Sequence, residues 1–142
     1  MNKFLERLKE LIKENEISYE ELAIQTNIGT PAMYAWSGNY NMPKLNNIIL
    51  LSNYFKCSIE YLIGRSDDNS ELPPKECLPF HIQLENILKQ RKLNITHLRN
   101  SGVISAGLSE SIFTLHSSPH MENVIKIADY LKISIDELVG RV

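Results

Sequence analysis

Apolar residues recur at intervals of three and four along the first part of the chain, and this is the period of an amphipathic α-helix. The first run predicts a helix over about residues 2–15, whose inward positions are Phe4, Leu5, Leu8, Leu11 and Ile12. Ser18, with Glu21 three residues later, has the pattern of a capping box and predicts the start of a short second helix. That helix would turn Leu22 and Ala23 toward the core.

Three more helices are predicted by the positions that follow. Thr30, which stands before a proline, has the pattern of an N-cap, so a third helix is expected to start there and to bury Met33 and Trp36. A fourth helix is expected over about residues 44–55, and Ser58 would cap a last short one. The inward residues of the fourth helix are expected to be Leu45, Ile48, Ile49 and Leu51. Because no segment shows sustained period-2 alternation, the sequence predicts an all-α protein.

The chain contains an internal repeat, in which the same sequence pattern recurs at an offset of 76 residues. At that offset CSIEYLIGR lies against ISIDELVGR, and residues 4–65 share fifteen identities with residues 80–141 without a gap. The segment 66–79 between the copies is rich in acidic residues, serine, asparagine and proline, which is typical of a linker. We therefore expect a first domain over residues 1–65, a linker, and a second domain over residues 80–142.

The second copy departs from the first in its middle, between residues 100 and 119. The 76-residue offset puts Ser109 at the position of Met33, whereas a slip of one residue would put Leu108 there. Two glycines, Gly102 and Gly107, weaken helix formation in the same stretch. The sequence leaves the local register open.

Composition and charge narrow the classes of function. The 142 residues are 43% hydrophobic and 23% charged, and the net charge of −2 argues against binding to nucleic acid through bulk electrostatics. No run of 18 apolar residues and no signal-peptide pattern is present, so we expect a cytoplasmic protein without a membrane partner.

No catalytic, cofactor-binding or metal-binding motif is predicted, and an enzyme is not expected. Cys57 and Cys77 lack the spacing of a metal site, and the expected cytoplasmic compartment argues against a disulfide between them. Cys57 is expected to pack in the core. His116 and His120 are four residues apart, but Pro119 breaks the helical face that would bring them together.

Two stretches of the first copy carry a family resemblance. ISYEELAIQTNIGTPAMYAWSGNYNMP, followed by LNNIILLSNYFKCSIEYLIG, resembles the lambda-repressor/Cro-like (XRE-type) helix-turn-helix family. The matching features are Leu22 with Ala23, the apolar Ile28 after the turn, Met33 with Trp36, Pro43, and the segment from Ser58 to Gly64. The resemblance implies an all-α fold of two tandem five-helix domains, the second of them degenerate.

The resemblance also implies which residues would contact DNA, because the third helix of the family lies in the major groove. Four residues of that helix would face the bases: Thr30, Ala32, Tyr34 and Ala35. Five residues would contact the phosphate backbone: Tyr19, Asn39, Tyr40, Asn41 and Lys44. The family often places Arg, Lys or Gln on the exposed face of the third helix, yet residues 22–43 carry no charge. In the second copy the equivalent face would present Ser105, Ala106, Ser109 and Glu110.

These features lead to one functional expectation and one alternative. We expect a sequence-specific DNA-binding transcriptional regulator of bacterial or phage type, repressor-like, whose partner is a double-stranded operator, palindromic or with two half-sites. The second domain would serve pairing, as the dimerisation module of a homodimer or as a docking site for a protein partner, although a pseudo-dimer within one chain also fits. The alternative is a protein-interaction module that binds or antagonises another regulator without binding DNA.

Overall fold

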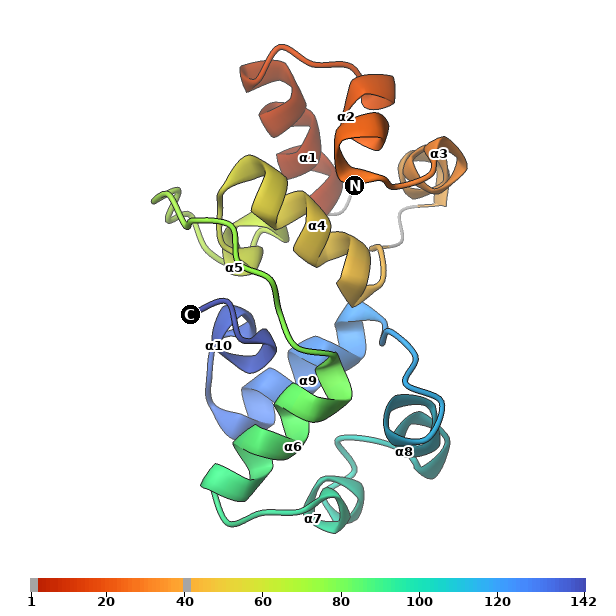
Figure 1. The fold of residues 1–142 in the computed structure, drawn as a ribbon, viewed down its shortest axis with the longest axis vertical. Coiled ribbons are helices and arrows are strands. Elements are labelled where there is room, and N and C mark those ends of the chain that lie inside the picture. Colours follow the sequence, from red (N-terminus) through yellow and green to blue (C-terminus); the bar gives the residue numbers. More distant parts are fainter. Residues whose placement is uncertain (1–2, 40–41) are drawn as a thin grey trace. The chain divides into compact units, whose positions relative to one another are not determined.

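The computed structural model describes residues 3–39 and 42–142, and for residues 37–39 it describes the main chain alone. The chain divides into two compact units, unit 1 (Met1–Pro74) and unit 2 (Lys75–Val142). Within the described residues the regular structure is helical and no strand occurs, as Figure 1 shows. The prediction of an all-α protein is confirmed.

Unit 1 is built on helix α4, which packs against α2 and α5, while α1 packs against α5. The bounds of the helices are α1 (Lys3–Glu14), α2 (Tyr19–Thr26), α3 (Thr30–Asn39), α4 (Leu45–Phe55) and α5 (Ile59–Leu62). Their core consists of residues that the hydrophobic period predicted, among them Phe4, Leu8, Leu22, Leu45, Ile48 and Leu51. Each fully buried side chain of this size contributes roughly 1.5–3 kcal/mol to folding. Ile12 and Ile49, which were expected to face inward, are half-buried.

Helix α3 is held to unit 1 by two side chains, as the sequence predicted. Met33 is fully buried and Trp36 is 7% exposed. The ring of Phe4 in α1 meets Trp36 edge to face, with ring centroids 6.0 Å apart. Because these two positions fix one side of α3 against the core, the residues between them face away from it.

Local hydrogen bonds set the ends of the short helices. The Ser18 hydroxyl accepts from the backbone N–H of Glu21 at 3.1 Å, and the Ser58 hydroxyl accepts from that of Tyr61 at 3.0 Å. Both bonds satisfy one of the donors left open in the first turn of a helix. The capping role predicted for Ser18 and Ser58 is confirmed.

Unit 2 contains five helices in the described residues, and most of them start at the same offset from those of unit 1. Their bounds are α6 (Phe80–Gln90), α7 (Ile95–Asn100), α8 (Ala106–Phe113), α9 (Met121–Leu131) and α10 (Ile135–Val139). Helices α7 to α10 begin 76 residues after α2 to α5. Ile112 is 1% exposed at the position that corresponds to Trp36. The start of α8 therefore keeps the 76-residue register, without the slip that would put Leu108 in the place of Met33.

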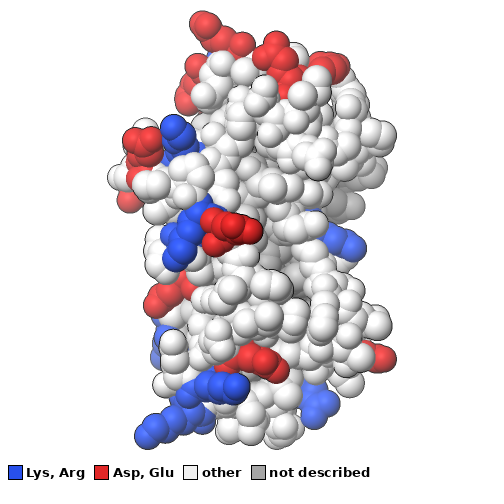
Figure 2. Space-filling model, in the orientation of Figure 1, with Lys and Arg blue, Asp and Glu red and all other residues white. Residues whose placement is uncertain are grey.

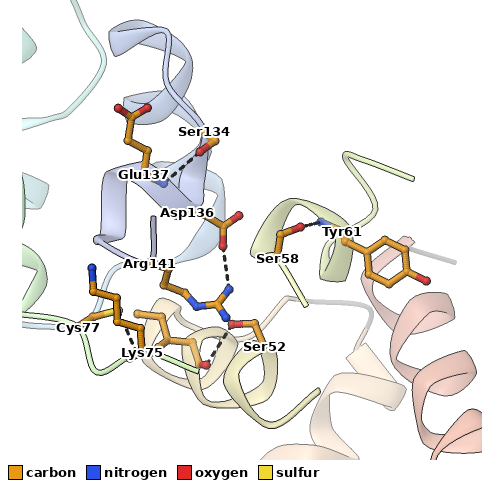
Figure 3. Close-up of polar contacts among 10 residues, drawn as sticks. Ser52, Ser58, Tyr61, Lys75, Cys77, Ser134, Asp136, Glu137 and Arg141 are labelled. Carbon is orange, nitrogen blue, oxygen red and sulfur yellow. Dashed lines mark hydrogen bonds and ion pairs between the residues drawn. The ribbon is translucent and has the colours of Figure 1, made fainter. Parts of the chain in front are cut away.

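In both units the last helix begins at a capping serine and is closed by an ion pair. Ser134 caps α10 through the N–H of Glu137 at 3.0 Å, just as Ser58 caps α5 (Figure 3). Asp136 of α10 forms an ion pair with Arg141 at 2.8 Å (Figure 3). At the equivalent positions of unit 1, Glu60 and Arg65 form an ion pair at 3.4 Å. These matching pairs lie five residues apart in both units, beside a glycine of positive φ.

Residues 66–79 form no helix, and their first part belongs to unit 1. The N–H of Leu72 donates to the carbonyl of Lys56 at 2.9 Å, and Asp67 lies 3.5 Å from Arg7 of α1. None of the helices in the described part of the chain is long and apolar enough to cross a membrane.

Candidate nucleic-acid interface

A tight turn over residues 27–29 joins α2 to α3. Asn27 has φ 59°, in the left-handed region, and its N–H donates to the carbonyl of Ile24 at 3.4 Å. The N–H of the next residue, Ile28, donates back to Ala23 at 3.1 Å. These two bonds form a Schellman motif, in which asparagine is the usual alternative to glycine. Since Ile28 is itself buried, the turn fixes the angle between the two helices.

The capping position of α3 lies one residue earlier than the sequence predicted. The carbonyl of Gly29 accepts from the N–H groups of Ala32 at 3.1 Å and Met33 at 3.3 Å, so Gly29 occupies the capping position and Thr30 lies in the first turn. The prediction that Thr30 is the N-cap is therefore off by one position.

The outward face of α3 is uncharged and partly aromatic. Tyr34 is 50% exposed, Ala35 is exposed, and Thr30 and Ala32 are half-buried. Figure 2 shows no charged side chain over α3, whereas acidic side chains gather over the end of unit 1 where α1 and α2 meet. The four residues expected to face the bases thus lie on one helix, and none of them carries a formal charge.

Tyr34 makes two contacts with the start of α2. Its ring lies 5.9 Å from the ring of Tyr19, with the planes inclined by 33°. Its hydroxyl donates to Oε1 of Glu20 at 2.5 Å, a length typical of a hydrogen bond to a carboxylate. This bond lowers the pKa of the Glu20 carboxyl below its usual value and raises the pKa of the Tyr34 phenol. The aromatic residue of α3 and the acid of α2 therefore form one connected group.

Tyr19, expected near a phosphate, is the first residue of α2 and is half-buried beside Tyr34. Burial raises the pKa of its phenol, and its hydroxyl oxygen has no hydrogen-bond partner among the described residues. The structure thus brings Tyr19 and Tyr34 together, from two different helices.

The remaining predicted phosphate contacts lie after α3. Lys44 is exposed and occupies the N-cap position of α4, where its carbonyl accepts from the N–H of Asn47 at 3.1 Å. Asn39 is the last residue of α3, and its side chain lies outside the described part of the structure. Tyr40 and Asn41 lie outside the described residues altogether.

Glu20 is the residue of this surface that sequence reasoning missed. Its position in the first turn of α2 is explained by the helix dipole alone, which favours acids there. Nothing local in the sequence links it to Tyr34, because the two lie 14 residues apart.

The corresponding turn in unit 2 is longer. Helix α7 ends at Asn100 and α8 begins at Ala106, so residues 101–105 join them. The left-handed residue is Gly102, with φ 81°, and the N–H of Val103 donates to Leu98 at 3.2 Å. The Schellman motif is thus present one position earlier than in unit 1. Ser105 then caps α8 through the N–H of Leu108 at 3.0 Å.

Other candidate groups of unit 2 are dispersed. Glu110 is exposed on α8, and the basic side chains of Lys89, Arg91, Lys92 and Arg99 are exposed on or just after α6 and α7.

His116 stacks on His81 with parallel rings and centroids 3.8 Å apart. Within the described part of the chain, no three His, Cys, Asp or Glu side chains are grouped closely enough to hold a metal ion. Cys57 of unit 1 is buried, as expected, and Cys77 is partly buried.

Comparison with known proteins agrees with the geometry of unit 1. Residues 7–68 match the family model of the Cro/C1-type HTH DNA-binding domain. The chain is also 25% identical, over 65 residues, to YobD of Bacillus subtilis (strain 168), which is named as an uncharacterized HTH-type transcriptional regulator. That similarity covers 46% of this chain and 58% of the relative, so the chain spans little more than half of that protein. No solved structure matches the chain. The short turn between α2 and α3 and the family match together support a Cro/C1-type helix-turn-helix DNA-binding domain in residues 7–68.

Proposed function

We propose that this chain is a sequence-specific DNA-binding transcriptional regulator, repressor-like, and that α3 is its reading helix. The observation that carries the proposal is the Schellman turn at Asn27, which sets α3 on α2 with its outer face exposed, within a segment that matches a DNA-binding family. In such domains the second helix of the motif lies in the major groove and its first helix crosses the backbone.

The side chains of α3 imply that each helix-turn-helix domain binds DNA with modest affinity. Hydroxyl groups of Thr30 and Tyr34 and methyl groups of Ala32 and Ala35 would meet base edges, and Lys44 would meet a phosphate. No arginine or glutamine stands at these positions, so the bidentate pairings worth about 1–3 kcal/mol of discrimination each are absent from this face. We infer that two helix-turn-helix domains bind one operator together.

Unit 2 is proposed to be a second, degenerate copy of the domain that serves pairing. The common offset of the helix starts and the matching ion pairs near the end of each unit support the duplication. The longer turn before α8 argues against groove reading by unit 2. Dimerisation through unit 2 would then bring two α3 helices to a palindromic site.

A second function is favoured by one observation. Ile24 is 78% exposed on α2, the helix that packs against the uncharged α3. Exposed apolar side chains beside aromatic ones are typical of protein interfaces. On this reading the helix-turn-helix binds another regulator and does not bind DNA.

The two functions are separated by binding to duplexes enriched from a random pool, measured over a series of salt concentrations. A DNA-binding protein retains its preferred duplex over random DNA. Its affinity should fall slowly with salt, because it neutralises only a few phosphates and each contributes about −0.9 to the slope. Lack of binding to any enriched duplex at low salt would leave the protein-interaction function as the explanation.

A further inference from the structure

The contact between Glu20 and Tyr34 has a consequence for what the interface can recognise. The phenol donates its proton to Oε1 of Glu20 at 2.5 Å, and both side chains are exposed to solvent. The ring of Tyr34 is also fixed in place by Tyr19, 5.9 Å away. The two polar groups are therefore presented together, from α2 and α3, on the face proposed to meet DNA.

The Glu20–Tyr34 pair can accept hydrogen bonds but has no proton left to donate. An ionised carboxylate only accepts hydrogen bonds, and a phenol whose proton is already donated has only acceptor capacity left. The shifts in pKa reinforce this state, because the carboxyl of Glu20 ionises more readily and the phenol of Tyr34 holds its proton more tightly. At neutral pH the pair presents oxygen lone pairs and no donor.

Acceptors of this kind discriminate among base edges in the major groove. Guanine presents two acceptors there, thymine presents an acceptor and a methyl group, and phosphates accept as well, so all of these are disfavoured beside a carboxylate. Adenine carries a donor next to the acceptor N7, whereas cytosine carries its N4 donor without a second acceptor on the same base. Cytosine is therefore the base that matches an acceptor pair best.

We propose that Glu20 and Tyr34 form an acceptor pair that reads the N4 amino group of a cytosine, with Glu20 as a specificity-determining residue of the interface. The inference rests on the proposed DNA-binding function and deepens it, because it assigns one base to one pair of side chains. Glu20 also explains how an α3 surface without Arg or Gln can select a sequence, since the polar group that selects comes from α2.

The test uses the full chain and its preferred duplex, in which each base pair is replaced in turn. The variants are Glu20→Gln and Tyr34→Phe, with Glu21→Gln as the matched control. Glu21 is the neighbouring exposed acid of the same turn, and its variant changes the net charge by the same amount. Circular dichroism on each variant verifies that the exposed substitution leaves the fold intact.

The wild-type chain is expected to prefer cytosine at one position by about tenfold over thymine. Glu20→Gln should abolish this preference at that position alone, because the amide can also donate to the keto oxygen of thymine. Tyr34→Phe should weaken the same preference. Glu21→Gln should strengthen binding to all duplexes at low salt without a change in base preference.

Two outcomes overturn the inference, and they are distinguishable. If the wild type selects a sequence and Glu20→Gln keeps the same base preferences, or changes affinity uniformly as Glu21→Gln does, the acceptor pair is refuted while the DNA-binding function stands. If the wild type binds no duplex with sequence preference, the proposed function fails and the inference fails with it.

Discussion

At the scale of single residues, α3 has two chemically separate faces. Met33 and Trp36 are buried and hold the helix to unit 1, whereas Tyr34 lies between them in sequence and is 50% exposed. Loss of a buried tryptophan leaves a cavity, but loss of an exposed side chain removes little apolar burial. The stability of unit 1 and its binding surface can therefore be changed independently.

Tyr34→Ala is expected to weaken specific DNA binding while lowering the free energy of unfolding by less than about 1 kcal/mol. Trp36→Ala, the control from the buried face, should lower it by about 3–5 kcal/mol. Denaturant unfolding of both variants measures the difference. Unfolding of unit 1 by Tyr34→Ala would show that the exposed face of α3 is wrongly assigned.

The buried residues of α3 were predictable from the sequence, but the Glu20–Tyr34 hydrogen bond was not. Helical period alone places Met33 and Trp36 on the core side. The hydrogen bond joins side chains of two helices, and whether they meet depends on the angle set by the turn between them. Single-residue patterns carry no information on that angle.

At the scale of elements, the turn between α2 and α3 is the feature on which the interface depends. Asn27 adopts φ 59°, a conformation that costs most non-glycine residues about 1–2 kcal/mol. The short side chain of asparagine tolerates it, and a β-branched side chain does not. The turn is therefore sensitive to the residue at position 27 even though that residue is exposed.

Asn27→Val is expected to lower the free energy of unfolding by about 1–2 kcal/mol, and Asn27→Gly should leave it unchanged or raise it slightly. Thermal unfolding followed by circular dichroism measures both. Equal stability of the valine and glycine variants would contradict the left-handed conformation assigned to this residue.

The helix caps at Ser18 and Ser58 were predictable from the sequence, whereas the longer turn of unit 2 was not. The capping serines Ser18 and Ser58 follow from short patterns whose partners are three residues away. The longer turn of unit 2 arises because the left-handed residue is Gly102, one position before the equivalent of Asn27, while the start of α8 is unchanged. Identity counts at a fixed offset do not detect a shift of this kind.

At the scale of the whole molecule, the chain consists of two helical units whose helices follow the same order. Helices α7 to α10 start 76 residues after α2 to α5, the offset at which the sequence has fifteen identities. The role of unit 2 depends on which of its surfaces bind a partner, and the positions of its helices do not reveal this. Its pairing function is therefore a proposal. If unit 2 pairs two chains, the operator carries two half-sites related by a two-fold axis.

Selection of bound duplexes from a random pool by the 142-residue chain tests the DNA-binding function most directly. We expect an enriched motif in two inverted copies, with half-site centres about 34 Å or a multiple of it apart. We also expect the Tyr34→Ala variant to lose the motif. A single copy of the motif would contradict pairing through unit 2, and failure of the wild type to enrich any sequence at low salt would contradict DNA reading by α3.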